Sequence, residues 1–198
     1  MKEYYEELWA RLPEDLAPPD QTLRRRFALA NVGPGDRALD LGCGTGDLAA
    51  DMSGAGAHVI AADVAQNALD RAHRRHPELD LRPVGFDGPL PFDDGAFTAV
   101  WSSEVIEHVA DTARWLSEVR RVLAPGGRVL LTTPSHGRLR LLAGGIERYS
   151  EPLGDHLHLY TARSLRELLR DFAFGDIEVR SVAGPPLARR LLLARAVR

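Results

Sequence analysis

Short apolar runs alternate with amphipathic segments along most of the chain, beginning at Arg37. Apolar runs bounded by Gly, Pro or Asp are typical of buried strands, whereas apolar residues three or four positions apart indicate helices with one buried face. This pattern predicts strands over residues 37–41, 58–63, 81–86, 97–102 and 128–133. It predicts intervening helices over residues 46–55, 65–76 and 104–123. Such alternation indicates a parallel sheet with helices on both faces.

The first part of the chain and one later segment depart from this alternation. Residues 1–35 carry apolar positions at helical spacing and predict a helical cap, in which Asp20 is placed to start the second helix. Residues 135–160 show no clear periodicity and contain Gly144-Gly145. We therefore expect a substrate-facing insertion or lid over residues 135–160.

The last part of the chain predicts how the sheet is completed. A helix is expected over residues 162–172, followed by two strands near residues 176–183 and 189–197 that pair as an antiparallel hairpin. With the five earlier strands this makes a seven-stranded, mostly parallel sheet in a three-layer α/β fold. We predict a single domain over residues 1–198.

Composition narrows the classes of partner. The chain is 44% hydrophobic and 27% charged and has a formal net charge of −3. That charge gives no overall attraction to nucleic acid or to an anionic membrane, and favours a small-molecule partner. The single cysteine, Cys43, has no internal disulfide partner, and the charged start of the chain resembles neither a signal peptide nor a membrane span. We therefore expect a cytoplasmic protein, of undetermined oligomeric state.

The most specific motif is the turn at residues 38–48, Ala-Leu-Asp-Leu-Gly-Cys-Gly-Thr-Gly-Asp-Leu. A predicted strand leads into three glycines at alternate positions, Gly42, Gly44 and Gly46, and then into a helix. Glycine permits positive φ and lets a ligand approach the backbone, and the helix offers unpaired N–H groups at its start. The motif predicts a nucleotide-type site.

Acidic residues follow the next strands. Asp40, Asp63 and Asp87 lie near the carboxyl ends of three successive predicted strands, and Ser103 follows a fourth. In an open parallel sheet these ends line one crevice. An acidic crevice disfavours a pyrophosphate and suits a ligand that carries a ribose, an exocyclic amine and a positive charge. S-adenosylmethionine has all three.

At these residues the chain resembles the class I S-adenosylmethionine-dependent methyltransferases. The matching segments are Leu39 to Gly46, Asp63, Asp87 to Phe97 and Leu123 to Val129. The resemblance implies a Rossmann-like fold with S-adenosylmethionine as the methyl donor. It implies that the glycine turn contacts the methionine portion, that Asp63 binds the ribose and that Asp87 binds the adenine amine.

Five further residues are candidates for the donor site. Val64 and Gly88 adjoin the two implied ligand-binding acids and are candidates for adenine packing and backbone contacts. Ser103 is a candidate from its place after the fourth strand. Cys43 is included as a small side chain between glycines rather than as a reactive thiol. Asp40 either contacts the donor or only orders the turn by hydrogen bonding.

A second motif, Ser102-Ser-Glu-Val-Ile-Glu-His108, follows the fourth strand. If it opens a helix, Glu104, Glu107 and His108 share one helical face, and His156 can approach from the later loop. These four residues are candidate ligands for Mg²⁺ or another divalent cation. The run is similar to that of ubiquinone-pathway O-methyltransferases and of small-RNA 3′-end 2′-O-methyltransferases, in which a magnesium-type ion acts. The alternative is a metal-free site, in which Glu104 and Glu107 complement the positive end of the helix and His108 packs against the sheet or contacts the substrate. The candidate catalytic residues are His108, as the base, and Glu107.

The sequence therefore predicts an S-adenosylmethionine-dependent methyltransferase that acts on a small-molecule acceptor, with O-methylation of a hydroxyl as the expected reaction. RNA 2′-O-methylation with a metal-assisted site is one alternative, and a donor-binding protein without activity is another. An NAD(P)-dependent oxidoreductase is a weaker alternative, because its turn usually follows the pattern G-x-G-x-x-G and position 47 here is Asp. Candidates for acceptor recognition, each with ordinary packing or a solvated charge as the alternative, are Tyr4, Tyr5, Trp9, Arg138, Arg148, Tyr149 and Tyr160.

Overall fold

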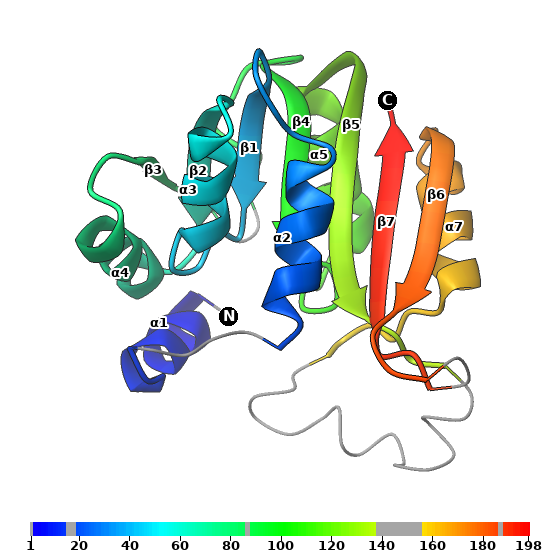
Figure 1. Ribbon diagram of the computed structural model, residues 1–198, viewed down its shortest axis with the longest axis horizontal. Helices are drawn as coiled ribbons and strands as arrows, with labels where there is room; N and C mark the ends of the chain where they lie inside the picture. Colours follow the sequence, from blue (N-terminus) through cyan, green and yellow to red (C-terminus); the bar gives the residue numbers. More distant parts are fainter. Residues whose placement is uncertain (1, 15–18, 86–87, 138–155, 186–187) are drawn as a thin grey trace.

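A single seven-stranded sheet organises the protein. The computed structural model describes residues 2–14, 19–85, 88–137, 156–185 and 188–198. The strands are β1 (Arg37–Leu41), β2 (His58–Asp63), β3 (Asp80–Pro83), β4 (Phe97–Ser103), β5 (Leu123–Pro134), β6 (Gly175–Val182) and β7 (Leu191–Val197). Their order in the sheet is β3-β2-β1-β4-β5-β7-β6 (Figure 1). β1 to β5 pair in parallel and β7 runs antiparallel to both neighbours, so the predicted fold class is confirmed.

Helices cover both faces of this sheet. They are α1 (Lys2–Arg11), α2 (Gln21–Leu29), α3 (Asp47–Gly54), α4 (Gln66–Arg75), α5 (Thr112–Val122) and α7 (Ala162–Asp171). In Figure 1, α2 and α3 lie in front of the sheet, and α5 and α7 lie behind it. α4 packs against β2 and β3, and α1 packs against α4.

A separate apolar core holds each helical layer to the sheet. Behind the sheet, Leu116 of α5 and Leu165 of α7 belong to the larger core, which includes Leu131 of β5. In front of it, Ala28 of α2 packs in a second core with the fully buried Trp101 of β4. Burial of this apolar area is the main stabilising contribution to the fold, and it fixes the strand ends from which the functional loops begin.

The helix predicted over residues 104–123 is wrong at its start. α5 begins at Thr112, where the Asp111 side chain accepts a hydrogen bond of 2.9 Å from the N–H of Arg114. Residues 104–111 form a loop, and Glu104 has a positive φ of 56°. Because Asp111 satisfies an otherwise free N–H, it is a favourable place for a helix to begin. The residues expected to share a helical face, Glu104, Glu107 and His108, therefore lie in a loop.

Other differences concern segment ends. β5 begins at Leu123 and runs through Pro125-Gly126-Gly127 instead of starting after it, with an irregular register next to Phe97. Asp20 occupies the N-cap position of α2 as predicted, but its side chain makes no capping bond and pairs instead with Arg190 at 2.6 Å. Most of the insertion predicted over residues 135–160 lies outside the described residues.

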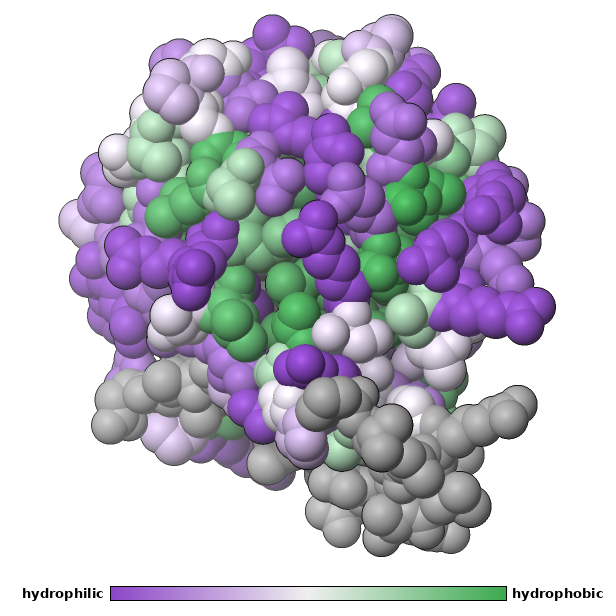
Figure 2. Space-filling view, turned by 45° about the vertical axis from the view of Figure 1, so that its right-hand side comes forward, coloured by the Kyte–Doolittle hydropathy of each residue, from purple (hydrophilic) through white to green (hydrophobic). Residues whose placement is uncertain are grey.

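The surface is mixed in character. Figure 2 shows a face on which hydrophobic side chains gather towards the middle and hydrophilic side chains surround them. Leu157 is the large hydrophobic residue most exposed within the described ranges, at 51%. None of the helices in those ranges has the length and apolarity needed to cross a bilayer.

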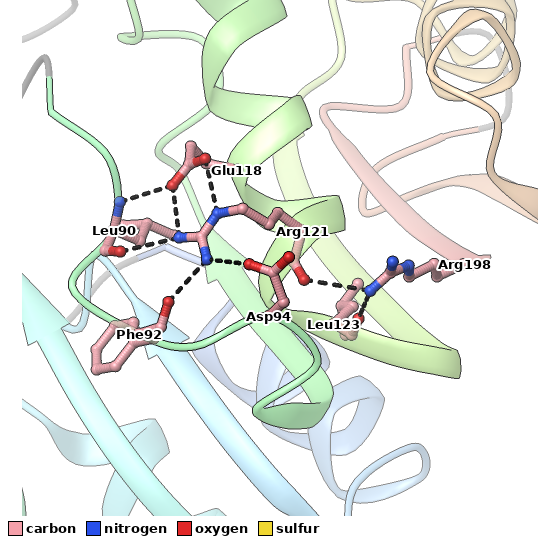
Figure 3. A network of polar contacts seen from close by, with 7 residues as sticks. All are labelled: Leu90, Phe92, Asp94, Glu118, Arg121, Leu123 and Arg198. Carbon is pink, nitrogen blue, oxygen red and sulfur yellow. Dashed lines mark hydrogen bonds and ion pairs between the residues drawn. The ribbon is translucent and has the colours of Figure 1, made fainter.

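Arg121 of α5 fastens the loop that precedes β4 (Figure 3). Its guanidinium donates to the carbonyl oxygens of Leu90 at 2.9 Å and Phe92 at 2.8 Å, and to the Asp94 carboxylate at 2.7 Å. It also pairs with Glu118, whose carboxylate accepts from the N–H of Leu90 at 2.8 Å. The arginine guanidinium is planar and carries five N–H donors, so one side chain can bind several acceptors of the loop at once.

We expect Arg121→Ala to lower the free energy of unfolding by about 2 kcal/mol, because it leaves carbonyl and carboxylate acceptors without their charged donor. Urea denaturation measures this change. Arg120→Ala is the matched control, since within the described ranges the Arg120 side chain makes a single hydrogen bond, of 3.5 Å, to the Ala173 carbonyl. We expect that variant to stay within about 0.5 kcal/mol of the wild type. Equal losses in the two variants would contradict the role assigned to Arg121.

Candidate functional site

A cavity of about 380 Å³ lies at the carboxyl ends of β1, β2 and β4. The predicted donor-site residues that line it are Asp40, Gly42, Cys43, Gly44, Asp63, Val64, Gly88 and Ser103. Glu104 and His108 line the same cavity. Asp87 lies outside the described residues. The structure therefore brings most of the predicted site residues to one place, from segments far apart in the chain.

The glycine turn after β1 adopts the conformation expected of it. Gly42, Gly44 and Gly46 have φ of 84°, 53° and 76°, a region that side chains with a Cβ rarely adopt. The N–H groups of Gly42 and Cys43 both donate to the carbonyl of Ala62, at 2.8 and 3.0 Å. These bonds hold the turn against the end of β2.

Protein side chains occupy the space that Cβ atoms on these glycines would need. A Cβ on Gly42 would collide with Val105, and a Cβ on Gly44 would lie 3.0 Å from the Trp9 ring. At Gly46 the neighbours are Leu79 at 3.0 Å and Ala72 at 3.2 Å. Gly46 lies next to these side chains and is not among the described lining residues, so its contact with the donor stays a prediction.

Asp63 joins the two turns that follow β1 and β2. One carboxylate oxygen accepts from the N–H of Gly44 at 3.0 Å, and the other from the N–H of Ala65 at 3.0 Å. The residue is 6% exposed, and burial raises the pKa of its carboxyl while these backbone donors lower it. Each carboxylate oxygen has capacity for a further hydrogen bond, so Asp63 can accept from ligand hydroxyls in the cavity.

Asp40 is the most perturbed acid of the turn. It is 2% exposed, and burial together with the charge of Asp63 raises its pKa to about 8. Asp40 is therefore neutral below that pH in the ligand-free protein. A positive charge in the cavity would favour its ionised form and lower the pKa.

Two further residues that line the cavity form an ion pair, which the sequence did not predict. Arg24 of α2 is 4% exposed, and its guanidinium lies 3.0 Å from the carboxylate of Glu104. Glu104 also accepts from the hydroxyl of Thr132 at 3.1 Å. The Nε of Arg24 is buried and has no hydrogen-bond partner among the described residues. Arg24 thus lines the cavity with unused donor capacity.

Glu107, His108 and His156 form a compact cluster beside the cavity. Their ligand atoms all lie within 4.8 Å of one another, and Glu104 is not part of this group. Glu107 is fully buried, and burial and then the charge of Glu104 raise the pKa of its carboxyl. One Glu107 oxygen accepts from Thr133 at 2.9 Å, and the other has no hydrogen-bond partner among the described residues.

A further histidine orients His156. The Nδ1 of His136 accepts from the N–H of Tyr160 at 2.9 Å, so in neutral His136 the proton lies on Nε2. That Nε2 lies 3.2 Å from the Nδ1 of His156. The rings of His156 and His108 are 5.1 Å apart, in an edge-to-face arrangement. His136 is a buried residue that sequence reasoning missed, because no motif near it indicated a role.

Comparison with known proteins decides the family. The family described as the methyltransferase domain matches residues 1–179. The chain is a member of the class I S-adenosylmethionine-dependent methyltransferases. The NAD(P)-dependent oxidoreductase alternative is therefore set aside.

Quinone-pathway enzymes are among the relatives of this methyltransferase. Over 125 residues it is 37% identical to demethylmenaquinone methyltransferase of Clavibacter sepedonicus, covering 62% of this chain and 51% of that one. It is 33% identical over 177 residues to the ubiquinone/menaquinone biosynthesis C-methyltransferase of Desulfotalea psychrophila, covering 77% of this chain and 72% of that one. The alignment with the first of these relatives thus spans about half of that protein.

Solved structures share the fold of this methyltransferase. An S-adenosylmethionine-dependent methyltransferase from Mesorhizobium loti matches with a TM-score of 0.70 at 22% identity, covering 94% of this chain and 100% of that one. Geranyl diphosphate C-methyltransferase from Streptomyces coelicolor matches with a TM-score of 0.75 at 18% identity, covering 100% and 97%. At these identities the matches establish the fold and leave the substrate open.

The raised pKa of Asp40 predicts a pH effect on donor recognition. S-adenosylmethionine carries a sulfonium charge and its product S-adenosylhomocysteine does not. As Asp40 ionises between about pH 6 and about pH 9, the affinity for S-adenosylmethionine should therefore rise relative to that for S-adenosylhomocysteine. Calorimetric titration of both ligands across this range measures the ratio. Asp40→Asn should make the ratio independent of pH, and an unchanged slope in that variant would contradict the assignment.

Proposed function

We propose that this methyltransferase transfers a methyl group from S-adenosylmethionine to a hydroxyl oxygen of a small-molecule acceptor. The observation that carries the proposal is that one cavity is lined both by the glycine turn with Asp63 and by His108. A donor held by the turn and an acceptor held near His108 would meet in that cavity. Holding the two in line supplies most of the rate enhancement of such a displacement.

Residues that follow several different strands would bind the donor. We assign the ribose hydroxyls to Asp63 and the methionine portion to the turn at Gly42 and Gly44. Asp87 remains the predicted partner of the adenine amine. The guanidinium of Arg24, which lines the cavity, suits the carboxylate of the methionine portion. Asp40 then lies where its ionised form would balance the sulfonium charge.

His108 is the proposed general base. As the acceptor oxygen forms its bond to the methyl carbon, the bond from that carbon to sulfur breaks and its electron pair stays on the sulfur. The acceptor hydroxyl proton passes to the His108 imidazole, which has a neighbouring carboxyl oxygen of Glu107 at 3.9 Å. The positive charge of the imidazolium that results would lower the raised pKa of Glu107, and the ionised carboxylate would in turn stabilise the imidazolium.

C-methylation is the second candidate reaction, and the names of the relatives favour it. One relative is a demethylmenaquinone methyltransferase and another is a quinone-pathway C-methyltransferase. For a hydroxylated aromatic acceptor, the same loss of a hydroxyl proton would make a ring carbon the nucleophile. Trp9 and Trp115 line the cavity and suit an aromatic acceptor. The net charge of −3 favours such an acceptor over RNA.

The same cluster fits a divalent cation. Glu107, His108 and His156 supply one carboxylate and two imidazoles, and a buried Glu107 oxygen has spare acceptor capacity. His156 would bind the cation through a nitrogen lone pair only if its Nδ1 no longer accepted from His136. With Glu104 paired to Arg24, this donor set suits a first-row transition metal better than Mg²⁺. Such a cation, when bound, lowers the pKa of an acceptor hydroxyl.

The experiment that tests the proposed reaction uses donor labelled with ¹³C in the methyl group and a panel of hydroxylated aromatic acceptors. The carbon resonance of the product separates a methoxy group from a methyl group on a ring carbon. We expect a methoxy product, and His108→Ala should lower kcat by about 10²-fold or more through loss of the base. The affinity for S-adenosylhomocysteine should change little in that variant.

Three outcomes would contradict this proposal. A ring-methyl product would establish the second candidate in its place. Methyl transfer only to RNA, with an affinity that falls steeply with salt, would establish a nucleic-acid substrate. Full activity of His108→Ala would remove His108 from the mechanism.

The cation assignment makes a separate prediction. We expect Zn²⁺ or Co²⁺ to raise the melting temperature and Mg²⁺ to leave it unchanged, because imidazole nitrogen binds transition metals more strongly than Mg²⁺. Thermal denaturation of chelator-treated protein measures the shift. Glu107→Gln should abolish it, whereas the matched variant Glu104→Gln should retain it. A shift that persists in Glu107→Gln would contradict the assignment.

A further inference from the structure

The helix α1 covers the cavity without being held there by a buried apolar face. Tyr5 and Trp9 of α1 line the cavity, and the Trp9 ring lies over Gly44 of the donor turn. Yet α1 contains no buried residue. Its apolar residues Tyr5, Leu8 and Trp9 are only half-buried, so polar contacts add to apolar packing in holding α1 beside α4, at the lower left of Figure 1.

Glu6 makes the principal contact at the start of α4. Its two carboxylate oxygens accept from the N–H groups of Gln66 at 2.7 Å and Asn67 at 2.9 Å. The Asn67 side chain donates in return to the Glu6 carbonyl at 3.0 Å. Residue 65, which precedes α4, is an alanine with no side-chain capping bond. Glu6 thus supplies from another helix the carboxylate that the positive N-terminus of α4 lacks.

Arg71 secures the other end of α1. Its guanidinium donates to the carbonyls of Leu12 at 2.5 Å and Pro13 at 3.0 Å, just after the helix ends. It also lies 5.8 Å from the centre of the Trp9 ring, in a cation–π arrangement. Both attachments belong to α4, which directly follows the turn that carries Asp63. The position of Trp9 over the donor turn is therefore set by α4.

We propose that Glu6 is a positioning residue that acts through Trp9. By capping α4 it holds α1 across the cavity, so that the Trp9 ring retains the bound donor or its product. Release of the product then requires the Glu6 contacts to open. This proposal rests on the donor site assigned above.

Stopped-flow measurement of S-adenosylhomocysteine dissociation tests the role. We expect Glu6→Ala to raise the dissociation rate and the Kd by about tenfold, which corresponds to about 1.4 kcal/mol. Glu6→Gln keeps one oxygen acceptor and should give an intermediate rate. The matched control is Glu7→Ala, which removes the same charge from α1 but, among the contacts of the described residues, disrupts a single exposed pair with Arg11. Its dissociation rate should equal that of the wild type.

A double-mutant cycle distinguishes positioning from general destabilisation. If Glu6 acts through Trp9, Glu6→Ala should add little to the dissociation rate in a Trp9→Ala background. Additive effects of the two substitutions, or equal rates in Glu6→Ala and Glu7→Ala, would overturn the proposal.

A measurement without ligand separates this proposal from the donor assignment. Amide hydrogen exchange across α1 of the ligand-free protein should be faster in Glu6→Ala than in Glu7→Ala, because undocking exposes the helix. If the wild type fails to bind S-adenosylhomocysteine, the donor assignment fails while this exchange difference remains. Equal exchange in the two variants would overturn the docking role of Glu6 whatever the protein binds.

Discussion

Two backbone N–H groups, from Gly44 and Ala65, donate to the carboxylate of Asp63, and the arrangement of the site depends on these bonds. They join the turn after β1 to the turn after β2. The parallel register of the two strands brings the turns together, since Leu41 lies beside Ala62. Trp9, Val105 and α4 then pack against the fixed glycine turn. A single buried carboxylate therefore couples the sheet register to the shape of the cavity.

Acids outnumber bases among the buried ionisable groups of the site. Asp40, Asp63 and Glu107 are acids with raised pKa values, while Arg24 is the buried cation placed among the cavity residues by the described contacts. Burial of carboxyl groups costs free energy unless they are protonated or meet a cation. Binding of a cationic ligand would therefore offset part of the free-energy cost of burying these carboxyl groups. Binding and stability are linked for this reason.

Much of the fold could be predicted because the apolar runs were distinct and their spacing was regular. The strand at residues 58–63 matches β2 in full. The helix predicted from residue 104 failed because side-chain spacing cannot reveal that Glu104 takes a positive φ and that Asp111 starts the helix. Arg24 was missed because three consecutive arginines look alike in sequence and only the packing of α2 buries this one. Contacts such as that of Glu6 with α4 join residues about sixty positions apart, and no local pattern indicates them.

The strand order leaves β3 and β6 at the two edges of the sheet. On β3, Arg82 pairs with Asp80 at 2.6 Å, and Pro83, which has no N–H, ends the strand. On β6, Arg180 pairs with Glu178 at 2.8 Å. Charged residues and proline at an edge discourage the addition of a further strand. Both edges are therefore protected against strand-by-strand aggregation, and a protein partner would find easier access to the helical faces.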